Sequence, residues 1–131
     1  MLQISLKFGI YDLESSPDEI TELLGIEPSE TFIKGCGYGK HERIAKENAW
    51  LIETIAEGDQ IEDEKLAKLL HYVIPAIKKL RQAMPSHSTQ LGIVINTDEA
   101  NPGLHINKEN MHLLNSVSAT LDIDIYALGE S

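Results

Sequence analysis

The sequence is short of cysteine, of long apolar runs and of positive charge, and each shortage excludes a class of protein. Cys36 is the only cysteine, so no disulfide can form within the chain, and we expect a reducing, cytoplasmic compartment. The longest wholly apolar runs span a few residues, far below the ~20 residues that a membrane-spanning helix needs. The N-terminal residues lack the basic segment followed by an apolar run that marks a targeting sequence.

Basic residues are outnumbered in this chain. Eleven Lys and Arg face 21 Asp and Glu, which gives a formal net charge of −10. Proteins that bind nucleic acids broadly do so by neutralising phosphates with Lys and Arg, so we expect no nucleic-acid partner. Anionic lipid headgroups attract basic segments for the same reason, so we expect no membrane partner either.

Apolar residues, in contrast, are plentiful enough for a packed core. Hydrophobic residues make up 42% of the 131 residues, which is too many for a disordered chain. A chain of this length buries roughly two-thirds of the surface that its unfolded form exposes, so it needs no metal or disulfide to fold. No linker or internal repeat divides the sequence, and residues 1–131 are therefore predicted to form one domain.

The spacing of the apolar residues predicts both strands and helices. Strict alternation is typical of half-buried strands, and apolar residues at i, i+3, i+4 and i+7 are typical of helices with one buried face. Strands are predicted at 2–11, 31–34, 49–55, 91–95, 104–106 and 121–128. Helices are predicted at 17–24, between Ser16 as N-cap and Gly25, at 62–84, and after Asn107 as N-cap.

This order of elements predicts an α+β fold. Hairpins alternate with helical crossovers, which favours a two-layer sandwich of an antiparallel-dominated sheet with helices packed on one face. The first six elements follow the order β-α-β-β-α-β, which is the ferredoxin-like element order.

Several short motifs resemble a known bacterial family. They are Ser16-Pro17-Asp18-Glu19-Ile20, Leu24-Gly25-Ile26-Glu27-Pro28, Trp50-Leu51-Ile52, Ile106-Asn107-Lys108-Glu109 and Leu121-Asp122-Ile123-Asp124-Ile125-Tyr126. In this combination they resemble the family of domains of unknown function numbered 4279, over nearly the whole chain. The resemblance implies a small single-domain bacterial protein and brings no catalytic residue, cofactor or activity with it.

A glycine-rich loop with basic neighbours offers one function, the binding of an anion. Glycines let backbone N–H groups approach a phosphate, and the candidate residues are Gly35, Gly37, Gly39 and Lys40. The spacing departs from a phosphate-binding loop, because His41 stands where that loop has Ser or Thr and a strand follows instead of a helix. A flexible hairpin tip is the alternative. A small-molecule or nucleotide-binding domain, with or without enzymatic activity, therefore stays open as the second hypothesis.

Other candidate sites lack the pattern that their chemistry needs. Cys36 with His41 has the residue types of a nucleophile and its base, but no third residue that would orient them is evident. The five histidines form no metal-binding motif, and we expect surface positions for them, with His71 partly buried on the long helix. Asp122 and Asp124 share one face of a strand, where carboxylates more often block pairing with another chain than bind a cation. No catalytic residue, metal ligand or cofactor is predicted.

The acidic residues support the leading hypothesis, a non-enzymatic protein-binding module. They are segregated along the sequence: residues 12–30 hold seven acidic residues and no basic one. An acidic face steers a basic protein partner, and an immunity or antitoxin-like role fits this size and charge. The predicted partner-binding residues are Asp18, Glu22, Asp122 and Asp124. Self-association through an edge strand, giving a homo-oligomer, is a third possibility.

Overall fold

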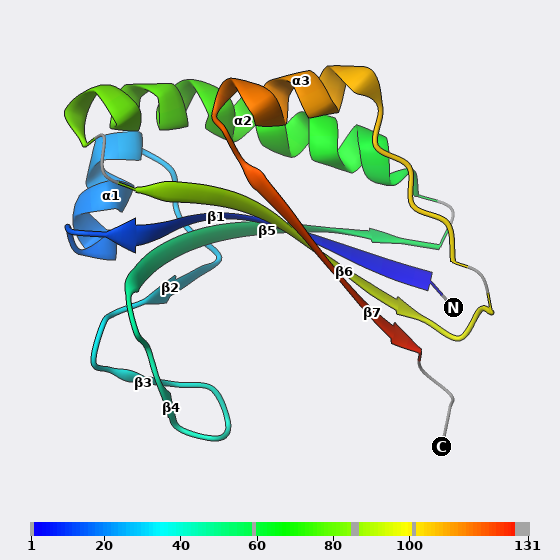
Figure 1. Cartoon of the computed structure of the whole chain (residues 1–131), viewed down its shortest axis with the longest axis horizontal. Coiled ribbons are helices and arrows are strands. Elements are labelled where there is room, and N and C mark those ends of the chain that lie inside the picture. The colour runs from blue at the N-terminus through cyan, green and yellow to red at the C-terminus, as the bar shows by residue number, and fades with distance from the viewer. Residues whose placement is uncertain (1, 59, 85–86, 101, 128–131) are drawn as a thin grey trace.

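The computed structural model describes residues 2–58, 60–84, 87–100 and 102–127. It confirms the α+β fold class: the described residues form three helices, a five-stranded sheet and a small two-stranded sheet. Figure 1 shows that the helices lie together on one side of the large sheet, while the small sheet projects from the other side. The two faces of the large sheet therefore have different surroundings.

The element bounds are close to those predicted from the sequence. The helices are α1 (Pro17–Leu24), α2 (Glu62–Ala83) and α3 (Lys108–Ser116). The strands of the large sheet are β1 (Leu2–Leu13), β2 (Glu30–Phe32), β5 (Asn48–Glu57), β6 (Ser88–Thr97) and β7 (Thr120–Ala127). The small sheet pairs β3 (Gly37–Tyr38) with β4 (Arg43–Ile44) inside the glycine-rich loop.

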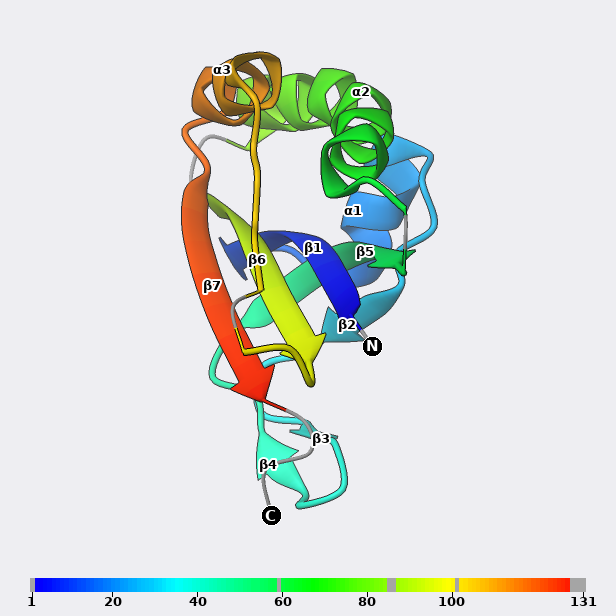
Figure 2. The ribbon, with the colours of Figure 1, turned by 90° about the vertical axis from the view of Figure 1, so that its right-hand side faces the viewer.

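The large sheet has the strand order β2-β5-β1-β6-β7. The central strand β1 pairs antiparallel with β5 on one side and with β6 on the other. The short strand β2 pairs antiparallel with β5, and β7 pairs parallel with β6. Seen along the sheet in Figure 2, β7 and β2 occupy opposite edges.

Local capping explains where two of the helices begin. The Ser16 side chain accepts a hydrogen bond from the Glu19 N–H, Pro17 occupies the first turn of α1, and Gly25 ends the helix with φ of 69°. The Asn107 side chain accepts a hydrogen bond from the Asn110 N–H at the start of α3. The predicted caps of both helices are thus confirmed.

The core lies between the helices and one face of the sheet. It includes the buried faces of β1, β5 and β6 and one stripe of α2. Trp50 of β5 is fully buried there, and its Nε1 donates a hydrogen bond to the Thr21 Oγ1 of α1 at 3.1 Å. This bond satisfies the indole N–H and attaches α1 to the sheet.

The prediction of a strand at 104–106 is wrong, because this segment forms no strand in the structure. The N–H groups of His105 and of the next N-cap, Asn107, donate to side chains of α2 instead of to a neighbouring strand. The His105 N–H donates to Glu62 Oε1 at 3.0 Å, and the Asn107 N–H donates to Asp63 Oδ1 at 2.9 Å. Carboxylates from a distant part of the sequence take the hydrogen bonds that a strand ladder would have used.

Among the described residues, none of the helices combines the length and the apolar character required to cross a bilayer.

Candidate binding surface

The face of the large sheet that points away from the helices is acidic. Side chains alternate between the two faces of a strand, and the core residues of β1 and β6 mark the helix side, so the intervening residues lie on the other side, called the open face here. The register places five carboxylates on the open face: Glu30, Glu53, Glu57, Asp122 and Asp124. Lys7 is the basic residue of β1 on the same face.

The positive charge of Lys7 is already engaged. Its Nζ lies 4.0 Å from Glu53 Oε2, and the Ser5 hydroxyl donates a hydrogen bond to the same carboxylate. The neighbouring Glu57 accepts a hydrogen bond from Gln3 Nε2 at 2.9 Å. Within the described part of the chain, neither Asp122 nor Asp124 has an ion-pair partner. The open face therefore keeps an excess of negative charge, which is spread over β2, β5 and β7.

The four residues predicted to bind a partner fall into two separate groups. Asp122 and Asp124 lie on β7, opposite Gly92 and Val94 of β6, and point to the open face. Asp18 and Glu22 are exposed on α1, which contacts β5 and α2 on the helix side. Figure 2 shows α1 and β7 on different layers and at different edges of the sheet. The structure does not bring all four carboxylates onto one surface.

The edge strand β7 is exposed on both faces. Three apolar side chains on its helix side remain largely accessible, with exposed fractions of 46% for Leu121, 42% for Ile123 and 59% for Ile125. In the described structure β7 is hydrogen-bonded to β6 on one side, and no strand lies on its other side. An apolar edge of this kind invites pairing with another chain unless charges oppose it.

We expect that Asp122 and Asp124 prevent two copies of this chain from joining through β7. If two β7 strands paired antiparallel about Ile123, Asp122 of each copy would lie opposite Asp124 of the other, and like charges in that position repel. Replacing both with threonine is expected to convert a substantial fraction of the protein to dimer, measured by light scattering after size-exclusion chromatography. The variant Asp18→Thr with Glu22→Thr removes the same charge from α1 and should elute as the wild type does. Equal elution of all three proteins would contradict this role.

The glycine-rich loop forms a hairpin in which β3 pairs with β4. Gly35, Gly37, Gly39 and Lys40 are all exposed there. The Gly35 N–H donates to the Ala45 carbonyl and the Cys36 N–H to the Ile33 carbonyl, both at 2.9 Å. These N–H groups are used inside the hairpin, so they are not free to surround an anion. The chain enters a two-residue strand here and not the N-terminus of a helix.

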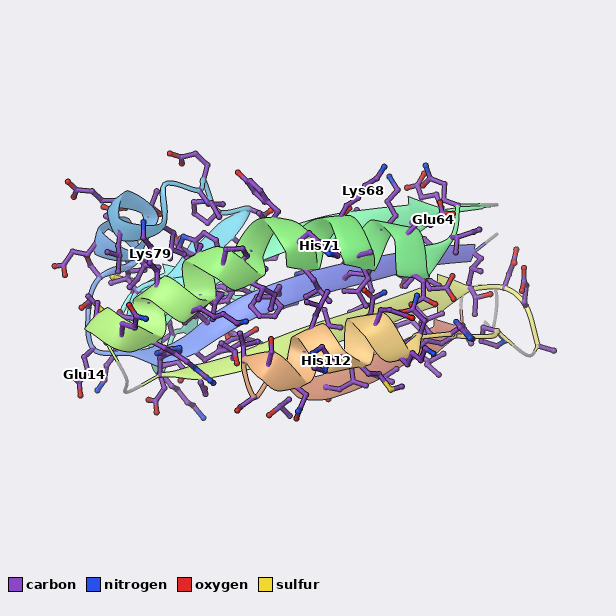
Figure 3. The ribbon with its side chains drawn as sticks, turned by 90° about the horizontal axis from the view of Figure 1, so that it is seen from above. Glu14, Glu64, Lys68, His71, Lys79 and His112 are labelled. Carbon is purple, nitrogen blue, oxygen red and sulfur yellow. The ribbon has the colours of Figure 1, made fainter. Side chains whose placement is uncertain are left out.

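Most of the other candidate residues lie on the surface, but the surface position expected for His87 is wrong, because its ring is partly buried and its Nδ1 lies 2.7 Å from the Met84 carbonyl oxygen. Cys36 is a free, exposed thiol. His71 on α2 and His112 on α3 are both exposed and lie on neighbouring helices, as Figure 3 shows. The predicted partial burial of His71 is wrong, since its Nδ1 lies 2.7 Å from the Ala67 carbonyl oxygen at the helix surface. The described residues contain no group of three or more metal-ligating side chains.

A buried carboxylate in the first turn of α2 was missed by the sequence interpretation. Asp63 is 8% exposed, and its Oδ1 accepts hydrogen bonds from the Asn107 N–H at 2.9 Å and from Asn110 Nδ2 at 3.0 Å. Its Oδ2 lies 2.5 Å from His105 Nδ1. Burial alone would raise the pKa of the Asp63 carboxyl, but these hydrogen bonds and the His105 charge outweigh burial and leave the pKa below its usual value. Asp63 thus joins the start of α2 to the start of α3.

The comparisons with known proteins identify a family. A family model described as "Domain of unknown function (DUF4279)" matches residues 3–128, essentially the whole chain, which confirms the resemblance found in the sequence motifs. No curated protein and no solved structure matches this chain.

Proposed function

This chain belongs to the family of domains of unknown function DUF4279, and we propose that it is a protein-binding domain whose partner carries a basic surface. The family description names no activity, so the support comes from the surface of this chain. The observation that carries the proposal is the open face, which holds five carboxylates and is not covered by any of the three described helices. An immunity or antitoxin-like role is one form that such binding takes.

Two physical effects favour a basic protein partner. Carboxylates on β2, β5 and β7 lie on one surface, so their fields add and attract positively charged surfaces during the diffusional encounter. The exposed apolar residues of β7, described above, lie on the helix side of the same edge strand, so a partner that reaches around this edge would remove them from water. Charge accelerates the encounter, and apolar contact slows dissociation.

The two acidic groups of the chain provide a matched test of this proposal. The open-face variant carries Asp122→Lys with Asp124→Lys, and the control variant carries Asp18→Lys with Glu22→Lys on α1. Both variants change the net charge by the same amount, so any difference between them reports the position of the charge. Tagged wild-type and variant proteins are produced in the native cells, and each co-purified protein is quantified by mass spectrometry.

We expect one basic protein to be retained by the wild type and by the α1 variant, and to be lost at least tenfold from the open-face variant. Retention by the wild type should also fall as NaCl is raised from 0.05 to 0.5 M, because salt screens exposed charges. Equal retention by all three proteins would disprove the proposal. Equal loss from both variants would show that net charge alone, and not the open face, attracts the protein.

A further inference from the structure

A cavity lies where the hairpin that contains β3 and β4 meets the open face of the sheet. Its volume is about 340 Å³, and its walls come from β1, β2, β3, β4 and the segment that leads into β5. The wall residues that matter most are three aromatic side chains, Tyr11, Phe32 and Tyr38, and two charged ones, Lys46 and Glu47. The hairpin thus closes one side of a site whose floor is the sheet.

Aromatic rings are concentrated at this cavity. The chain has two Phe, four Tyr and one Trp, and three of these rings line the cavity. The rings of Phe32 and Tyr38 have centroids 4.8 Å apart and planes tilted by 54°. The Tyr11 ring lies against the backbone of Gly9, where a Cβ atom would come within 2.5 Å of it. Glycine at position 9 therefore allows this ring to lie close to the sheet.

Three carboxylates act on the Tyr11 side of the cavity. Burial raises the pKa of the Tyr11 hydroxyl above its usual value. Negative charges on three nearby carboxylates raise this pKa further, and they belong to Glu47, Glu30 and Asp122. Lys46 is the basic residue of the lining, and its side chain is exposed. A ligand in the cavity would thus contact ring faces within the field of several carboxylates.

We propose that this cavity binds an organic cation, namely the guanidinium or ammonium group of an Arg or Lys side chain. Aromatic faces attract cations through the negative side of the ring quadrupole, and the attraction increases when water is excluded. Carboxylates nearby add Coulomb attraction and disfavour anions. The source of the cation rests on the function proposed above: the basic partner inserts one side chain here while it covers the open face. A free small cation is the other source of the same chemistry.

The test uses small probes and does not need the partner. The ¹⁵N-labelled full chain is titrated with N-acetyl-arginine amide, and the change in its NMR spectrum gives the Kd at constant ionic strength. The matched control probe is N-acetyl-citrulline amide, which has nearly the same shape and no charge. We expect saturable shifts at Tyr11, Phe32 and Tyr38 with the arginine probe, and binding at least tenfold weaker with the citrulline probe.

Variants of the lining should change the Kd in opposite directions. Phe32→Leu is expected to weaken binding of the arginine probe about tenfold, because it replaces a ring face by an aliphatic group. Glu47→Gln should weaken it about threefold, and Lys46→Gln should strengthen it about threefold. Tyr72→Leu changes an exposed ring on α2, outside the cavity, and should leave the Kd unchanged. If Phe32→Leu alters the fold, the two charge variants still decide the result.

The outcomes separate this inference from the proposed function. Absence of saturable shifts, or equal Kd values for the arginine and citrulline probes, would overturn the cation site even if the open-face variant loses its protein partner. Saturable binding with the expected order of variants supports the site. Tetramethylammonium binding more tightly than N-acetyl-arginine amide would also support a cation site and would identify a free ammonium compound as its ligand.

Discussion

Replacing Asp63 with alanine is expected to lower the free energy of unfolding by about 3 kcal/mol, although the carboxylate lies far from the open face. The substitution leaves the Asn107 N–H and the Asn110 side-chain amide without their acceptor. Buried donors that lose an acceptor cost about 1–3 kcal/mol each. Urea unfolding at pH 7, followed by circular dichroism, measures the effect.

The neighbouring residue Glu64 provides the control for this variant. Glu64 is exposed in the same first turn of α2, so Glu64→Ala removes the same charge from the helix N-terminus. We expect it to change the free energy of unfolding by no more than about 0.5 kcal/mol. Similar losses in the two variants would show that Asp63 acts through the helix dipole and not through its buried hydrogen bonds.

The stability provided by Asp63 should depend on pH in one direction. The pKa of its carboxyl is lower in the folded chain than its usual value, so the folded state holds the charged form more strongly than the unfolded state does. This contribution is complete above the unfolded-state pKa of about 3.9 and is lost as the pH falls through the folded-state value. The difference in stability between the wild type and Asp63→Ala should therefore be constant near pH 7 and decrease below about pH 4.

Leu70→Ala is expected to lower the free energy of unfolding by about 2–5 kcal/mol. The Leu70 side chain lies in the middle of α2 and is 0% exposed, so the substitution removes buried methyl groups and leaves a cavity against the sheet. Lys68→Ala, on the solvent side of the same helix in Figure 3, should change stability by less than about 0.5 kcal/mol. Urea unfolding of both variants tests this, and a small effect at Leu70 would show that the α2 stripe is not part of the core.

The sequence predicted those elements whose signals are local. Ser16, Pro17 and Gly25 define α1 through neighbouring residues, so the predicted bounds of 17–24 agree with the structure. Alternation likewise predicted β1 and β7, because one face of β1 is buried and β7 continues the same pattern at the edge.

The features that sequence interpretation missed depend on distant residues. The segment 104–106 has the apolar pattern of a strand, but Glu62 accepts the His105 N–H from 43 residues away. Asp63 accepts the N–H of the following residue, Asn107, from 44 residues away. Asp63 itself looked like an ordinary acidic residue of a first helical turn. The sequence shows only that Asp63 lies in an acidic first turn of α2. Glu64 lies in the same turn and is exposed, so this position alone does not distinguish the buried carboxylate from an exposed one.

In the candidate site, too, the features with a local sequence signal were predicted and those that depend on distant residues were not. That Asp122 and Asp124 share a face follows from their spacing, and the register confirms it. That Asp18 and Glu22 lie on another layer follows from the packing of α1 against α2 and β5, which no local pattern reveals. The aromatic cavity was missed because Tyr11, Phe32 and Tyr38 belong to three different strands. They meet because the hairpin is placed beside the sheet.

The central place of β1 has a consequence for how the chain is made. Ile4 lies opposite Ala56 on one side and opposite Ile95 on the other, so β1 is synthesised well before either of the strands with which it pairs. Folding that depends on contacts so distant in sequence is slow, and an unpaired apolar strand is prone to aggregate meanwhile. We expect the nascent chain to need chaperone protection of β1 until β6 has emerged.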